Sequence, residues 1–246
     1  MAQFAARYPA VAHTFAPALD DDVTLDDEAG HHLGRVQRVR PGEVITVADG
    51  RGHWRAYEVA RVARGAVQVR ARDRMAVEPS LEPRLVVAFA LTKGAKPDLV
   101  VQKLTELGVD GITVLAARRS VPRWSDERAG AALARLRRIA REAAAQCRRC
   151  RVPDVDGVRA VTELHGRSGL VVADPDGDDV AALPVPAGGE WVLVVGPEGG
   201  FEGDEAAALD GDRLCLAPHV LRAETAAIAG AAVLTTRRAH PPRSRA

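Results

Sequence analysis

Short, uninterrupted apolar runs that alternate with helical patterns dominate the chain from residue 85 onwards. The predicted strands cover residues 85–91, 111–115, 169–173, 191–195 and 213–216. A continuous apolar run such as LVVAFAL (85–91) is typical of a strand covered on both faces, as in a parallel sheet. Helices are predicted over residues 97–107, 133–150 and 224–237, where apolar or small residues recur at helical spacing. This alternation predicts an α/β domain with a mainly parallel sheet.

The N-terminal part of the chain has a different pattern. Strands are predicted over residues 44–48, 53–62 and 66–72, joined by Asp49-Gly50-Arg51-Gly52 and by Arg64-Gly65, which are typical of hairpin turns. A short helix is predicted over residues 31–40, ended by Pro41-Gly42. We therefore expect a small β-rich domain over residues 1–76, a proline-punctuated linker over residues 77–84 and the α/β domain over residues 85–246.

Charge is distributed unevenly along the chain. Residues 118–151 hold eleven arginines against three acidic residues, whereas residues 152–212 hold fourteen acidic residues against two arginines. All three lysines, Lys93, Lys96 and Lys103, fall in one short stretch. Lysine binds phosphate as a point charge. The asymmetry favours a nucleic-acid-binding face, although a solvated face on an arginine-rich helix explains it equally well.

Several classes of protein are not expected. No apolar run approaches the roughly 20 residues that a membrane-spanning helix needs, and the N-terminal residues lack a signal-peptide pattern. Three cysteines are too few and too scattered for a disulfide framework. Cys147-Arg148-Arg149-Cys150 has no second pair, and we place both cysteines on the buried side of a helix, so no metal is expected. The predicted location is the cytoplasm.

Two loops that each follow a predicted strand are the candidate functional segments. The first is Gly196-Pro197-Glu198-Gly199-Gly200, whose glutamate would repel a phosphate but not a cationic ligand. The second, LAPHVLRAETA (216–226), places Arg222 and Glu224 at the start of a helix of small residues. In α/β sheets, ligands bind at the carboxyl ends of strands. Each loop taken alone also fits an ordinary connection into a helix.

The two loops together resemble the paired cofactor loops of SPOUT methyltransferases. They are most similar to the RsmE-type family, which methylates N3 of a uridine in 16S ribosomal RNA. The segments LTKG (91–94), QKLTELGV (102–109) and Arg119-Ser120 follow the family's pattern in the same order. Residues 31–43 and Asp49-Gly50 resemble the family's N-terminal PUA-like RNA-binding domain.

The resemblance implies a SPOUT domain whose parallel sheet is tied in a trefoil knot, preceded by a small β-barrel PUA-like domain. It also implies S-adenosylmethionine as cofactor, the small ribosomal subunit as partner and a homodimer. The turn at residues 173–177 would form a third wall of the cofactor site. The implied cofactor-binding residues are Ala173, Gly196, Pro197, Glu198, Gly199, Gly200, Leu216, Ala217, Pro218, Val220, Leu221 and Thr225.

Arg222 and Glu224 are the predicted catalytic residues. Arg222 would stabilise the uracil anion, and Glu224 would either orient Arg222 or accept a proton. The predicted RNA-binding residues are Lys93, Lys96, Lys103, Arg119, Arg123, Arg135, Arg141, Arg149, Arg38 and Arg40.

Two positions differ from the family's usual pattern. Ala217 stands where the family has glycine, and Ala223 stands where it has threonine. An alanine forced to positive φ would be strained. The differences leave two alternatives open: an RNA-binding or ribosome-assembly factor without methyltransferase activity, or a methyltransferase that acts on another RNA.

Overall fold

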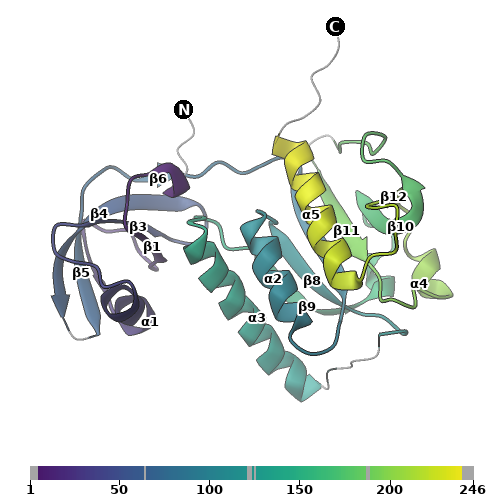
Figure 1. Ribbon diagram of the computed structural model, residues 1–246, viewed down its shortest axis with the longest axis horizontal. Coiled ribbons are helices and arrows are strands. Elements are labelled where there is room, and N and C mark those ends of the chain that lie inside the picture. Colours follow the sequence, from purple (N-terminus) through teal and green to yellow (C-terminus); the bar gives the residue numbers. More distant parts are fainter. Residues whose placement is uncertain (1–4, 64, 121–123, 125, 187–188, 240–246) are drawn as a thin grey trace, which may run out of the picture. The chain divides into compact units, whose positions relative to one another are not determined.

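The computed structural model describes residues 5–63, 65–120, 124, 126–186 and 189–239 of the 246 (Figure 1). The chain divides into two compact units. The first consists of Met1–Ser80 and Ala144–Val152, and the second of Leu81–Ala143 and Pro153–Ala246. The last three residues of the helix Asp126–Gln146 and the six residues after it therefore belong to the N-terminal unit.

The first unit contains a six-stranded sheet of order β1-β3-β4-β5-β2, with β6 paired to β4. Its strands are β1 (Ala12–Phe15), β2 (Asp22–Leu25), β3 (Val44–Ala48), β4 (His53–Ala63), β5 (Ala66–Ala71) and β6 (Ala76–Val77). β1 pairs with β3 in parallel, and the other pairs are antiparallel. The three strands predicted here are confirmed to within one residue at their ends.

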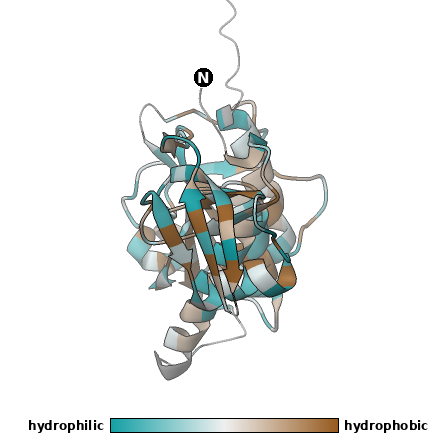
Figure 2. Cartoon of the chain, turned by 90° about the vertical axis from the view of Figure 1, so that its left-hand side faces the viewer, coloured by the Kyte–Doolittle hydropathy of each residue, from teal (hydrophilic) through white to brown (hydrophobic). Residues whose placement is uncertain are grey.

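Alternating residues give this sheet its core. Tyr57 and Val59 in β4, and Val67 and Val69 in β5, are buried. The residues that alternate with them, such as Glu58 and Gln68, are exposed. Figure 2 shows the alternation as hydrophobic and hydrophilic bands along the strands that face the viewer. Side chains on a strand point alternately to its two faces, so this pattern buries one face of the sheet.

The helix predicted over residues 31–40 is wrong in extent. The chain forms α1 (Asp27–His31), followed by a π-helical turn at His32–Val36. Arg38 then takes a φ of 53°, which ends the helical path before the predicted Pro41-Gly42 stop. The predicted linker also contributes structure, because its first residue, Val77 of β6, pairs with His53 of β4.

The second unit contains a six-stranded sheet of order β12-β10-β11-β7-β8-β9, in which every pair is parallel. Its strands are β7 (Arg84–Ala90), β8 (Gly111–Ala116), β9 (Asp154–Ala160), β10 (Leu170–Asp178), β11 (Glu190–Val195) and β12 (Asp212–Leu214). The predicted parallel α/β sheet is confirmed. The threading that would make it a trefoil knot stays a prediction.

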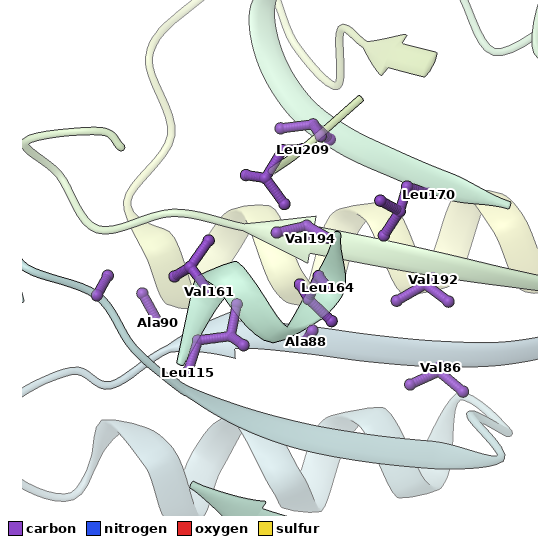
Figure 3. Close-up of a cluster of buried hydrophobic side chains, with 12 residues drawn as sticks. Val86, Ala88, Ala90, Leu115, Val161, Leu164, Leu170, Val192, Val194 and Leu209 are labelled. Carbon is purple, nitrogen blue, oxygen red and sulfur yellow. The ribbon is translucent and has the colours of Figure 1, made fainter. Parts of the chain in front are cut away.

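Both faces of this sheet are covered, which explains the continuous apolar runs. Figure 3 shows Val86 and Ala88 of β7 and Val192 and Val194 of β11 gathered on one face with Leu164 of a short 3-10 turn. The opposite face is covered by α5 (Ala223–Ala239), which packs on β7 and β11, and α2 (Lys96–Glu106) packs against α5.

The arginine-rich helix, α3, spans Asp126–Gln146, so it begins earlier and ends earlier than the predicted 133–150. Leu136, Ala140 and Ala143 are buried, as the helical spacing predicts. Cys147 and Cys150 follow the helix, so their predicted place on its buried side is wrong, although Cys150 is itself buried. No helix in the described ranges combines the length and the apolar character needed to cross a membrane.

Candidate functional site

A cavity of about 370 Å³ lies at the carboxyl ends of β10, β11 and β12. Three segments distant in sequence form most of its wall: the middle of β10, the loop after β11 and the loop from β12 into α5. Because all strands of this sheet are parallel, their carboxyl ends share one edge, and the loops that follow them converge there.

The loop after β11 is a tight turn. The Gly200 N–H donates a hydrogen bond to the Pro197 carbonyl at 2.8 Å, and Gly200 has a φ of 70°. A residue other than glycine rarely adopts this left-handed conformation. The turn brings Pro197, Glu198 and Phe201 to the cavity wall.

The middle of β10 forms the third wall. Ala173 and Asp178 both pair with Leu214 of β12, so the residues between them leave the ladder as a bulge. The predicted turn at 173–177 therefore lies inside a strand, as an interruption of its pairing. Asp174 and Pro175 from this bulge line the cavity.

The loop from β12 into α5 carries Ala217 without strain. Arg38 and Arg148 are the non-glycine residues with positive φ in the described part of the chain. The backbone at Ala217 is therefore one that alanine adopts readily. The side chain of Ala217 forms part of the wall of a cavity that stays open.

Two carboxylates line the cavity, and their surroundings differ. Asp174 forms an ion pair with Arg213, with 3.2 Å between Oδ2 and Nη1. Glu198 is exposed and has no ion pair within the described ranges. The remaining wall is largely aliphatic, with Val172, Leu214 and Leu221 among its residues. The cavity therefore combines an apolar lining with one uncompensated negative charge, which suits a ligand with a flat apolar part and a cationic centre.

Comparison with known proteins identifies the family. Residues 79–235 match an RNA methyltransferase domain, and residues 25–71 match an RNA methyltransferase PUA domain. The chain is 35% identical over 228 residues to the ribosomal RNA small subunit methyltransferase E of Mycobacterium tuberculosis, with 87% of each chain covered. This chain belongs to the ribosomal RNA small subunit methyltransferase E family. Its relative from Bacillus subtilis is 30% identical, with 82% of this chain and 85% of the relative covered.

A solved structure extends the comparison to three dimensions. The family member from Neisseria gonorrhoeae, crystallised with S-adenosyl methionine, superposes with a TM-score of 0.81 at 26% identity. The superposition covers 92% of this chain and 97% of the other. The SPOUT architecture with an N-terminal PUA-like domain, predicted from the sequence, is confirmed for this member of the family.

The structure gathers most of the predicted cofactor-binding residues of this methyltransferase E family member around the cavity. Those that line it are Ala173, Gly196, Pro197, Glu198, Gly200, Leu216, Ala217, Val220 and Leu221. Gly199 and Pro218 lie in the same loops and Thr225 lies in the first turn of α5, and all three are outside the lining. Sequence reasoning missed Phe201, Leu209 and Arg213, which also line it. Phe201 directly follows the glycine loop, Gly196–Gly200, so its place in the chain was the signal that could have identified it.

The two predicted catalytic residues, Arg222 and Glu224, have different surroundings. Arg222 is exposed between Leu221 and Ala223, which both line the cavity. The ion pair of Glu224 is with Lys96 of α2, at 3.0 Å between Oε1 and Nζ. Burial raises the pKa of Glu224, but its own backbone N–H, Lys96 and Arg222 outweigh this effect, and the net pKa is lowered. Oε2 of Glu224 is buried without a hydrogen-bond partner in the described structure.

The predicted RNA-binding residues that the structure describes fall into three groups. Lys93, Arg38 and Arg40 are exposed. Four others are engaged within the chain: Lys96 with Glu224, Lys103 with Glu106, Arg135 with Asp98, and Arg119 with the glycine loop. Arg141 is exposed and Arg149 half-buried, and both make contacts within the chain. Arg123 lies outside the described residues.

Proposed function

We propose that this chain is an S-adenosylmethionine-dependent methyltransferase that methylates N3 of a uridine in the 16S ribosomal RNA of the small subunit. The observation that carries the proposal is the three-loop cavity, with its apolar wall and the single unpaired carboxylate of Glu198. The named relatives and the cofactor-bound relative support both the reaction and the cofactor.

The residues of the cavity fit this cofactor. An apolar wall with Val172, Phe201 and Leu214 suits the adenine and ribose, and a volume of about 370 Å³ lies within the range of small-molecule sites. Glu198 would face the positive charge of the sulfonium. When bound, S-adenosylmethionine supplies a methyl group that the sulfonium has already activated for transfer.

The side chains beside the cavity must favour an anionic uracil, because a neutral imide nitrogen is a poor nucleophile. Arg222 stabilises that anion from its place between Leu221 and Ala223. Glu224 stays ionised through its pair with Lys96, and because its Oε2 is buried, it orients Arg222 while the proton that leaves N3 passes to water. Lys96 is thereby assigned to the catalytic centre, whereas the exposed Lys93, Arg38 and Arg40 contact phosphate.

We also propose that the enzyme acts as a homodimer in the cytoplasm. Dimers are common among enzymes of this size, and the family resemblance points the same way. Sedimentation equilibrium on the purified protein tests this assembly: twice the chain mass supports it, and the mass of one chain contradicts it.

The reaction is tested with small subunits from cells that lack the activity. Incubation with the protein and labelled S-adenosylmethionine should label 16S ribosomal RNA, and reverse transcription should then stop at one uridine, because N3 methylation blocks base pairing. Label in transfer RNA, or cofactor binding without any label in RNA, would refute the proposal in favour of another RNA target or of a binding-only factor.

The role of Arg222 is tested by substitution. Removal of a group that stabilises developing charge commonly costs a factor of about 10²–10³ in turnover. Arg222→Ala should show a loss of this size with unchanged cofactor affinity. Arg159→Ala is the matched control, because Arg159 is another exposed arginine of the same unit, and its ion pairs among the described residues are local, with Asp156 and Glu163. Full turnover of Arg222→Ala with intact cofactor binding contradicts the assignment.

A further inference from the structure

The turn that follows β8 is bound tightly to the glycine loop of the cavity. Arg119 in this turn donates from Nη1 to the Gly199 carbonyl at 2.6 Å. Its Nε donates to Oε2 of Glu202 at 3.0 Å, and its Nη2 lies 3.0 Å from the same oxygen. One guanidinium thus holds the loop at two positions three residues apart.

Arg118 adds a second attachment just beyond the loop. Its backbone N–H donates to Oε1 of the buried Glu205 at 2.9 Å, and its guanidinium donates to Asp204 at 2.7 Å. Asp204 and Glu205 form the first turn of α4 (Asp204–Ala207). Together, the two arginines fix both the glycine loop and the start of the helix after it.

Arg119 is in direct packing contact with the loop backbone. A Cβ at Gly199 would lie 3.2 Å from the Cδ of Arg119, so the methylene stem of the arginine occupies the space beside this glycine. The neighbours of Gly199, Glu198 and Gly200, both line the cavity. A displacement of Arg119 would therefore be transmitted directly to the cavity wall.

The same contacts set the charge of the site. Glu202 and Asp204 form ion pairs with Arg119 and Arg118, whereas Glu198 lines the cavity and has no ion pair among the described residues. The side chains of Arg119 and Glu202 are 50% and 41% exposed, so their ion pair contributes little to the stability of the fold. What the pair determines is the conformation of the loop.

We propose that Arg119 is a positioning residue for the methyl donor, which holds the glycine loop in its binding conformation and leaves Glu198 as the charge that faces the sulfonium. This role rests on the proposed function of the cavity. It differs from the phosphate contact that the sequence predicts for Arg119.

The test compares full-length wild-type protein, Arg119→Ala, Arg119→Lys and the control Arg159→Ala. S-adenosylhomocysteine affinity is measured by calorimetry, and KM for the methyl donor, kcat and the salt dependence of RNA binding are measured on the same samples. Arg119→Ala should weaken cofactor binding and raise KM about tenfold. A tenfold change is at the low end of what the loss of a hydrogen bond from a charged group costs. Its kcat at saturating donor, its unfolding midpoint and its RNA salt slope should match the wild type.

Lysine should restore part of the affinity, because one ammonium reaches either Gly199 or Glu202 but not both. A Glu202→Gln substitution should add less in the Arg119→Ala background than in the wild type. Unchanged cofactor affinity in Arg119→Ala, with RNA binding weakened and its salt slope reduced by about one, would make Arg119 a phosphate contact and overturn the proposal. If the wild type itself binds no S-adenosylhomocysteine, the proposed function of the cavity fails, and the role of Arg119 fails with it.

Discussion

The histidine buried in the first unit gives that unit a pH-dependent stability. His13 is 3% exposed, its Nδ1 lies 2.8 Å from the Thr46 hydroxyl, and its ring packs edge-on against Phe15. Burial lowers the pKa of His13 from 6.5 to about 4, an effect that the backbone of Arg149 opposes and the charge of Arg148 reinforces. The folded unit therefore holds a neutral ring at pH values where the unfolded chain takes up a proton.

The sign and the size follow from linkage. Above pH 6.5 the ring is neutral in both states, and the stability of the unit is undiminished. As the pH falls from 6.5 to 4, protonation stabilises only the unfolded state, so the free energy of unfolding falls. A shift of 2.5 pH units corresponds to about 3 kcal/mol. His13→Gln removes the titrating group and should remove this part of the pH dependence, whatever its effect on stability at pH 7.5.

Hydrogen exchange read by mass spectrometry measures this unit separately. Corrected protection of peptides from β3 and β4 should fall between pH 7 and pH 4 by about 3 kcal/mol more in the wild type than in His13→Gln. Peptides from β7 and β11 serve as an internal control, and His53→Gln removes an exposed histidine of the same unit. Parallel pH dependence in the wild type and His13→Gln, or an NMR titration of His13 near pH 6.5, would refute the reasoning.

Two further predictions concern the second unit. Alanine at Gly230 of α5 would place a Cβ 2.5 Å from Cδ2 of Leu193, whereas alanine at Gly130 of α3 meets nothing within 4 Å. Thermal or urea unfolding should show Gly230→Ala destabilised by about 1–3 kcal/mol and Gly130→Ala stabilised by about 0.5–1 kcal/mol, and equal effects would contradict the packing argument. Lys96→Met removes a partner that lowers the pKa of Glu224, so the acid limb of the pH–rate profile should move to higher pH; an unmoved limb would exclude Glu224 as the group that must be ionised.

The strands that sequence reasoning missed have one neighbour in their sheet instead of two. β1, β2 and β9 each lie at the end of a sheet order, and β6 lies off the order and pairs with β4. β2 reads DVTL and β9 reads DVDGVRA, and both have several exposed residues, so neither shows a continuous apolar run. The interior strands β7, β8 and β11 were predicted to within one residue because both of their faces are buried. β1 is buried along its whole length, but it reads AHTF, and its histidine and threonine interrupt any apolar run. Periodicity reports the burial of apolar side chains, and an edge strand is held mainly by backbone hydrogen bonds that leave little trace in the side chains.

The site was predictable to the extent that it lies in the loops themselves. The loop with glycines and a proline (196–200) and the proline-containing loop (216–226) were found because they directly follow predicted strands, and the structure brings them to one cavity. The partner of Glu224 was not found, because Lys96 lies 128 residues earlier, at the start of another helix. No local pattern carries information about such a pair, since only the packing of α2 against α5 brings the two residues together.

The uneven charge of the chain has a partly internal explanation. Within residues 118–151, Arg118 and Arg119 pair with α4 and the glycine loop, Arg135 pairs with Asp98, and Arg137 donates to the Val155 carbonyl. These arginines neutralise or satisfy acceptors of their own unit, so the local excess of positive charge overstates what is available to a polyanion. Affinity for RNA depends on the number of phosphates that are neutralised, which salt dependence measures directly. The salt slope should therefore correspond to fewer phosphates than the eleven arginines of this stretch, because a guanidinium already bound to a carboxylate must break that pair before it gains a phosphate.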